Sequence, residues 1–258
     1  MLLLVNDDGI HSPGLRYLYR ALRKASGLPV LAVAPTAQHS GQSHAITLER
    51  GLTATPLLEE GFFGFSVDGT PADCVKLALK VLAPREVRLV VSGINDGPNV
   101  GRSIFYSGTV GAAVEAAIEG YPALAVSRDH GEGEAEQGLQ RAGRYAAALA
   151  AECIGRRELR GSVLNLNLPR AIADPEQRPY MVPHGRSGFD ETYRARRDQH
   201  GRLTWVLTGR RYERDDEGRT DAHILRTGRA TLSLLRPDFN AEPDHLPARL
   251  LARLAVRG

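Results

Sequence analysis

The chain has 258 residues, of which 42% are hydrophobic and 24% charged, and its formal net charge is +3. This length and mixed composition predict one α/β domain with elaborations, and they exclude a collagen, a disordered chain and a coiled coil. The basic excess is confined to the C-terminal part, because residues 1–150 carry net −2 and residues 151–258 net +5. Only three basic residues are lysines, and genome composition, thermal adaptation or a function of arginine in phosphate and interface ion pairs explains this bias.

The N-terminal segment has the pattern of a strand, a helix and a second strand. Residues 2–5 are an apolar run that stops at the polar cluster Asn6-Asp7-Asp8-Gly9, as a buried parallel strand does. Apolar residues recur at helical spacing after Pro13, and Gly27 is a stop signal. Residues 29–34 form the next apolar run. This order predicts a βαβ unit with a right-handed crossover.

The same alternation continues along the chain. Residues 46–52 and 62–67 are expected to form strands, in a hairpin at the side of the sheet. Thr70-Pro71-Ala72-Asp73 provides an N-cap, a proline at the first helical position and an acid in the first turn, and so predicts a helix over 71–82. Alternating strands and helices predict a mostly parallel, doubly wound α/β sheet. The further strands are expected over 87–91, 123–126 and 163–167, and the further helices over 109–119 and 135–152.

The pattern changes beyond Pro169. Residues 178–219 are polar and Arg-rich, and the alternation from Thr192 to Thr208 around His200-Gly201 predicts a long exposed hairpin. Such a hairpin has no core of its own, so we expect it to pack against another subunit. The last elements expected are a strand over 229–235 and a short amphipathic helix over 246–254.

These patterns divide the chain into a core, residues 1–170, and a C-terminal extension, residues 171–258. Cys74 and Cys153 are too far apart to suggest a disulfide framework or a zinc site, which favours a reducing compartment. The first apolar run is too short for a signal peptide, and no stretch approaches the ~20 apolar residues of a membrane span. The sequence therefore predicts a soluble, cytoplasmic protein that binds no membrane.

Polar residues follow three strands of the predicted sheet, at the edge where open α/β sheets bind ligands. Asp7 and Asp8 end the first strand side by side, where their charges repel unless a cation lies between them. Ser40 and Asn95 are expected at the ends of neighbouring strands. Carboxylate, hydroxyl and amide oxygens are ligands of hard divalent ions, so these four residues predict a Mg²⁺ or Mn²⁺ site. The alternative is that one Asp caps the next helix and the other is solvated.

A second candidate site is the N-terminus of the helix expected over 109–119. Ser107-Gly108-Thr109 opens this helix with two hydroxyls and with backbone N–H groups that attract an anion. Gly97 and Gly101 flank Asn99 and would let the backbone approach a phosphate closely. A plain N-cap with close helix packing, and a simple turn, are the alternatives. The sequence lacks the motifs of P-loop NTPases, dinucleotide dehydrogenases, zincins and α/β-hydrolases.

With these motifs the chain resembles the SurE family (survival protein E), whose members are metal-dependent nucleotidases. The resemblance implies a Rossmann-like α/β core with a C-terminal extended hairpin that mediates dimers or tetramers. It also implies release of phosphate from nucleoside 5'- and 3'-monophosphates, and some members trim short polyphosphate. The matching stretches fall in order over residues 1–126: Asn6 to Ile10 with Pro13-Gly14, Ala34-Pro35 before Ser40-Gly41, Gly69 to Val75, Ser92 to Asn95 with Gly97 to Asn99, and Tyr106 to Val110.

The resemblance also implies individual roles. Ligands of one divalent metal ion per subunit are implied to be Asp7, Asp8, Ser40 and Asn95. The residues around the phosphate are implied to be Asn99, Ser107, Gly108 and Thr109. His39 stands where an arginine is common in the family, and a substrate contact and a solvated imidazole fit it equally well.

We expect hydrolysis of a phosphomonoester by a water on or beside the metal, oriented or deprotonated by Asp7 or Asp8. One alternative is a phosphatase with an Asp nucleophile, which needs an Asp-x-Asp arrangement that the adjacent carboxylates do not provide. The other is a nucleic-acid-binding or regulatory protein that uses the Arg-rich hairpin. Acidic residues dilute that stretch and stacking aromatics are sparse, so the prediction is a nucleotidase that binds nucleoside monophosphates and no nucleic acid.

Overall fold

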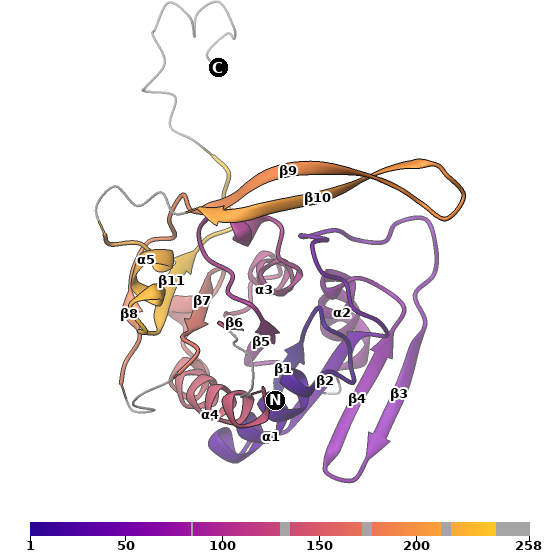
Figure 1. Ribbon diagram of the computed structural model, residues 1–258. Helices are drawn as coiled ribbons and strands as arrows, with labels where there is room; N and C mark the ends of the chain where they lie inside the picture. Colours follow the sequence, from indigo (N-terminus) through magenta and orange to yellow (C-terminus); the bar gives the residue numbers. More distant parts are fainter. Residues whose placement is uncertain (84, 130–134, 172–176, 213–217, 241–258) are drawn as a thin grey trace, which may run out of the picture.

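The computed structural model describes residues 1–83, 85–129, 135–171, 177–212 and 218–240. Within them a nine-stranded sheet runs in the order β3-β4-β2-β1-β5-β6-β7-β11-β8 (Figure 1). Its strands are β1 (Leu2–Val5), β2 (Val30–Pro35), β3 (Ala54–Glu59), β4 (Phe62–Val67), β5 (Leu89–Asp96), β6 (Ala123–Arg128), β7 (Val163–Leu168), β8 (Tyr180–Met181) and β11 (Thr231–Leu235). The helical elements are α1 (Pro13–Ser26), α2 (Pro71–Leu77), η1 (Ala78–Leu82), η2 (Gly101–Phe105), α3 (Gly108–Ile118), α4 (Ala135–Cys153), η3 (Arg157–Leu159) and α5 (Asp221–Arg226).

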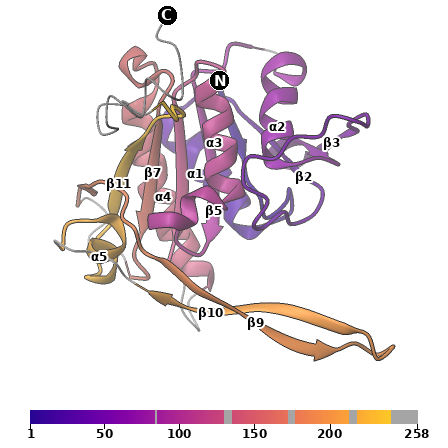
Figure 2. The same cartoon turned by 90° about the horizontal axis from the view of Figure 1, so that it is seen from above.

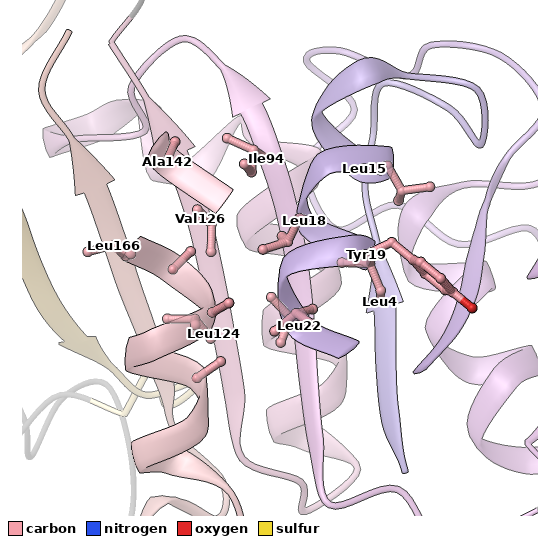
Figure 3. Packing of buried hydrophobic residues seen from close by; sticks show 14 of the residues in the cluster. Leu4, Leu15, Leu18, Tyr19, Leu22, Ile94, Leu124, Val126, Ala142 and Leu166 are labelled. Atoms are coloured by element: carbon pink, nitrogen blue, oxygen red, sulfur yellow. The ribbon is translucent and has the colours of Figure 1, made fainter. Parts of the chain in front are cut away.

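The centre of the sheet is parallel and covered by helices on both faces. β1 pairs in parallel with β2 and β5, and β5, β6 and β7 continue in the same direction. Along β1, Leu2 and Leu4 pack with residues of α1 and α4, whereas Leu3 and Val5 pack with residues of α2 and α3. Figure 3 shows the first of these two cores, with Leu18 between α1 and the sheet. The predicted doubly wound α/β fold is confirmed.

Local signals place the helices where the sequence predicts them. Ser12 caps α1 through the backbone N–H of Leu15, and Gly27 ends the helix in a left-handed conformation, with φ 65°. Thr70 and Asp73 form a reciprocal capping box at the start of α2. The helix expected over 71–82 is α-helical only to Leu77, and its last part is the π-helical turn η1.

The strand expected over 46–52 is wrong. The side hairpin instead joins β3 and β4, which pair in antiparallel fashion from Ala54 with Val67 to Glu59 with Phe62. Residues 46–52 form an irregular segment, in which a side chain of α2 contacts the backbone. The Asp73 carboxylate accepts hydrogen bonds from the backbone N–H and the hydroxyl of Thr47, at 3.0 and 2.6 Å. These bonds use the backbone N–H of Thr47, which a strand ladder would need.

The C-terminal part adds two structures to the parallel core. β11 pairs antiparallel with β7 and parallel with β8, so the extension lengthens the sheet at one edge. β9 (Gly188–Arg197) and β10 (Leu203–Tyr212) form the predicted long hairpin, which projects away from the sheet (Figure 2). The division at residue 170 stays a prediction, and the helix expected over 246–254 lies outside the described residues. In the described part, no helix has the length and apolar character needed to cross a membrane.

Candidate functional site

Hydrogen bonds gather three chain segments at the carboxyl end of β1. The backbone N–H of His39 donates to the carbonyl oxygen of Asp7 at 2.7 Å, which fixes the loop after β2 against the end of β1. The side-chain amide of Gln38 donates to Asp8 Oδ1 at 3.3 Å and to Ser40 Oγ at 2.9 Å. Gln38 therefore bridges Asp8 and Ser40, two of the predicted metal ligands.

The N-terminus of α3 is the third segment. The hydroxyl of Thr109, which is fully buried, donates to Asp7 Oδ1. A Cβ at Gly108 would lie 2.8 Å from Asp7 Cβ, so only glycine allows the helix to approach this carboxylate so closely. The hydroxyl of Ser107 accepts the backbone N–H of Val110 at 3.0 Å as an N-cap. The two hydroxyls expected around a phosphate are thus bonded to Asp7 and to the helix itself.

β5 brings Asn95 and Asp96 to the same edge of the sheet. β5 runs beside β1, and a register shift between Ser92 and Asn95 displaces its last residues relative to β6. The side-chain nitrogen of Asn95 donates to the carbonyl oxygen of Gly97 at 2.6 Å. That bond uses the amide nitrogen, so the amide oxygen is the atom of Asn95 that a hard cation would take as a ligand.

Electrostatics at this edge disfavour negative charge. Burial raises the pKa of Asp8 to about 6, and the neighbouring charges of Asp7 and Asp96 add to this effect. Burial also raises the pKa of Asp7, and this effect outweighs the opposing hydrogen bonds from Thr109. Two carboxylates that are costly to ionise together form a place where a cation would relieve the cost.

The donor set fits a hard divalent ion rather than zinc. Among the described residues, no group of three or more His, Cys, Asp and Glu side chains could hold a metal. Asp7 and Asp8 supply two carboxylates, and Ser40 and Asn95 add a hydroxyl and an amide oxygen. Such a small, all-oxygen set suits an ion that keeps several of its waters, as Mg²⁺ does.

Asn99 lies in a buried polar network near the carboxyl ends of β6 and β7. Its amide nitrogen donates to Ser127 Oγ at 2.8 Å, and its backbone N–H donates to Asn167 Oδ1 at 2.8 Å. The side-chain amides of Asn165 and Asn167 both donate to the carbonyl oxygen of Asn99. Sequence reasoning missed this network, although asparagines at alternate positions of the predicted strand over 163–167 place two polar side chains on one buried face.

Of these residues at the carboxyl ends of the strands, the sequence predicts His39 as a candidate, whereas it does not predict Gln38 or Asp96. The ring of His39 pairs through Nδ1 with Gln42 Oε1 at 2.8 Å, so its side chain is engaged within its own loop. Gln38 lies two residues before Ser40, and Asp96 directly follows Asn95. That adjacency was the only signal available, and it does not identify a bridging amide or a third carboxylate.

A hollow of about 590 Å³ lies near the amino-terminal end of β2. It is bounded by the end of α1, the start of β2 and the turn between β3 and β4, with Tyr19, Arg23 and Phe62 among its lining residues. None of the predicted site residues lines it. The hollow therefore has no part in the site at the end of β1.

Comparisons with known proteins point to one family. The family model for survival protein SurE matches residues 2–189. A protein of Desulfovibrio desulfuricans named 5'-nucleotidase SurE is 41% identical over 99% of both chains. A Moorella thermoacetica protein of the same name is 39% identical over 93% of this chain and 91% of its own. The crystal structure of the SurE protein from Aquifex aeolicus superposes with a TM-score of 0.77 at 30% identity, covering 93% of this chain and 94% of that one. The chain therefore belongs to the SurE family.

Proposed function

We propose that this protein is a metal-dependent nucleotidase that hydrolyses nucleoside 5'- and 3'-monophosphates to nucleoside and phosphate. The observation that carries the proposal is the pair Asp7 and Asp8 at the end of β1, with raised pKa values and with the N-terminus of α3 packed against Asp7. The relatives named 5'-nucleotidase SurE support the same activity, and they lend no support to a nucleic-acid-binding protein.

Four residues would hold one divalent ion, Mg²⁺ or Mn²⁺, in each subunit: Asp7, Asp8, Ser40 and Asn95. When bound, such an ion polarises a phosphoryl oxygen and lowers the pKa of a coordinated water. Gln38 orients two of these ligands at once, because its amide contacts both Asp8 and Ser40. Thr109 fixes the rotation of the Asp7 carboxylate through Oδ1.

The two carboxylates have different surroundings and therefore different roles. Asp7 is buried, and its Oδ1 accepts a hydrogen bond from Thr109, which suits a fixed ligand. Asp8 is less buried, and Gln38 donates to its Oδ1. We therefore assign to Asp8 Oδ2 the acceptance of a proton from the attacking water. The N-terminus of α3 faces the same place and supplies positive potential to the phosphoryl group of the substrate.

Phosphate release from a panel of substrates tests this function. The panel contains nucleoside 5'- and 3'-monophosphates and short polyphosphates, each with Mg²⁺, with Mn²⁺ and with excess EDTA. We expect release from the monophosphates with metal, none with EDTA, and a loss of turnover in Asp8→Asn. Full activity in EDTA would contradict the metal. Salt-dependent binding of a long oligonucleotide without any phosphate release would instead favour the nucleic-acid alternative.

The partner side of the proposal is a homodimer or tetramer formed through the C-terminal extension. The β9–β10 hairpin projects from the sheet and exposes large apolar side chains, among them Tyr193 and Trp205. A two-stranded ribbon of this kind is marginally stable in water by itself. A second copy of the chain is the partner that would cover it.

A further inference from the structure

The loop between β2 and β3 carries Ser40, yet it contains no regular secondary structure to hold that residue in place. Its first part is tied to the site by the His39 backbone and by the Gln38 side chain. Ser40 itself is exposed. The position of its hydroxyl therefore depends both on Gln38 and on what holds the part of the loop that follows it.

That following part is clamped onto α3 and the turn before it. The backbone N–H of Ser43 donates to the carbonyl oxygen of Tyr106 at 3.1 Å, and its hydroxyl donates to that of Phe105 at 2.6 Å. A Cβ at Gly111 would overlap the carbonyl oxygen of Ser43, so the loop lies directly on the helix. Ser43 adopts a left-handed conformation, with φ 56°, which costs energy that these contacts offset.

Glu115 on α3 also binds the loop. It lies four residues after Gly111 and so on the same side of α3. Its side chain is only 3% exposed, and it binds His44 Nε2 at 2.5 Å and Lys76 Nζ at 2.7 Å. Burial raises the pKa of Glu115, but the hydrogen bonds from His44 and Lys76 outweigh burial and lower it. A charged, buried carboxylate therefore holds one residue of the loop and one residue of α2.

We infer that His44 is a positioning residue for the metal site. Its bond to Glu115 holds the Ser40 loop at one place along α3, the same helix whose N-terminus contacts Asp7. The bond thereby sets the separation between Ser40 and the carboxylates at the end of β1. This inference rests on the proposed metal site. Lys76, on α2, binds the same carboxylate. Its replacement is therefore a matched control, because it removes a positive charge beside Glu115 and leaves the His44 bond to the loop in place.

The test is Mn²⁺ binding to the metal-free protein, measured by titration calorimetry without substrate, together with kcat, KM and the melting temperature. We expect His44→Ala to weaken Mn²⁺ binding about tenfold, the size of effect typical when a group that orients a ligand is removed. His44→Gln retains a donor and should recover most of this loss. Lys76→Met should bind Mn²⁺ within about twofold of the unmodified protein, because Lys76 lies on α2, is 42% exposed and leaves the His44 bond in place. The KM for nucleotide should change less than the Mn²⁺ affinity.

Two further variants keep the inference open to refutation. His44→Phe keeps a ring in the loop but cannot bind Glu115, so it replaces His44→Ala if that variant fails to fold. Unchanged Mn²⁺ binding in either variant, or an equal loss in Lys76→Met, would overturn the role of His44. Asp8→Asn separates this failure from that of the metal site. If Asp8→Asn loses Mn²⁺ while the His44 variants keep it, only the positioning role fails; if Asp8→Asn also keeps it, the proposed metal site fails and the inference with it.

Discussion

The Asp8 carboxyl opposes folding of the metal-free protein at neutral pH. Its pKa is about 6 in the folded chain against 3.8 for the ordinary group, so folding favours the protonated form. The contribution of Asp8 to stability is therefore full below pH 3.8 and is lost as the pH rises through 6. We expect Asp8→Asn to raise the free energy of unfolding at pH 7 by about 1 to 2 kcal/mol, allowing for solvent screening of a partly exposed group.

Urea unfolding in EDTA measures this effect at two pH values. The advantage of Asp8→Asn should shrink as the pH falls through 6 and vanish below pH 3.8, because Asp8 is then protonated in both the folded and the unfolded chain. With saturating Mn²⁺ the order should reverse, since the unmodified protein gains binding free energy that the variant lacks. Equal stability of the two proteins at pH 7 in EDTA would show that the negative charge of Asp8 does not destabilise the folded protein.

Thr109 contributes to the proposed site through its hydrogen bond to Asp7. Its buried hydroxyl donates to Asp7 Oδ1, so it would orient this proposed metal ligand. We expect Thr109→Val to weaken Mn²⁺ binding by about ten- to a hundredfold, as the loss of such a partner does elsewhere. Thr109→Ser keeps the hydroxyl and should bind Mn²⁺ nearly normally. Calorimetry on the metal-free proteins compares them, and equal affinity of the two variants would contradict an orienting role.

Individual residues of the site differ in how far the sequence predicts them. Asp7 and Asp8 are predictable because a four-residue apolar run places them at the end of a buried strand. The Ser107 cap follows from the local helix signal. Gln38 and Asp96 are not predictable in the same way, because their contacts depend on the path of irregular loops. The family resemblance implies that Asn99 lies near a phosphate, and only the fold reveals its buried partners on β6 and β7.

Helices and strands are likewise predictable from the sequence where local signals decide them, and not where distant contacts do. The continuous apolar strands and the capped helices form as predicted, because burial on both faces and cap residues act locally. The segment over 46–52 is expected to be a strand but forms none, and Asp73 of α2 accepts the backbone N–H of Thr47 there. β5 runs past residue 91 to Asp96, because pairing with β1 and β6 carries it through the polar stretch.

Asp221 joins the C-terminal extension to the segment that leads into α3. This fully buried carboxylate accepts the backbone N–H groups of Gly101, Gly185 and Ala222, at 2.9, 2.8 and 2.8 Å. Asp221→Asn turns one acceptor oxygen into a donor that faces a backbone donor. We expect a loss of about 1 to 3 kcal/mol in the free energy of unfolding, measured by urea titration.

A matched control for Asp221 is Asp238→Asn. Asp238 is an exposed carboxylate that accepts hydrogen bonds from Asn240, two residues away. Its replacement should change stability by less than about 0.5 kcal/mol, as is usual for surface substitutions. If both variants unfold at the same urea concentration as the unmodified protein, the buried carboxylate does not hold the extension to the core.

At the scale of the whole molecule, the hairpin has two unlike faces. Cross-strand partners share a face, and one face carries the pairs Tyr193 with Leu207 and Ala195 with Trp205. The opposite face carries Thr192 with Thr208, joined through their hydroxyls. Tyr193 is 63% exposed and Trp205 62% in the single chain. Large apolar side chains gathered on one exposed face are typical of an association surface, so we expect the hairpin to contact another subunit through this face.

The oligomer should therefore depend on one face of the hairpin and not on the other. We expect the unmodified protein to form a dimer or a larger assembly, and the double variant Tyr193→Glu, Trp205→Glu to dissociate, because each glutamate would bury a charge at the contact. Thr192→Glu with Thr208→Glu adds the same two charges to the opposite face and should leave the assembly intact. Size-exclusion chromatography with light scattering measures the masses. A monomeric unmodified protein, or equal dissociation by both double variants, would contradict association through the apolar face.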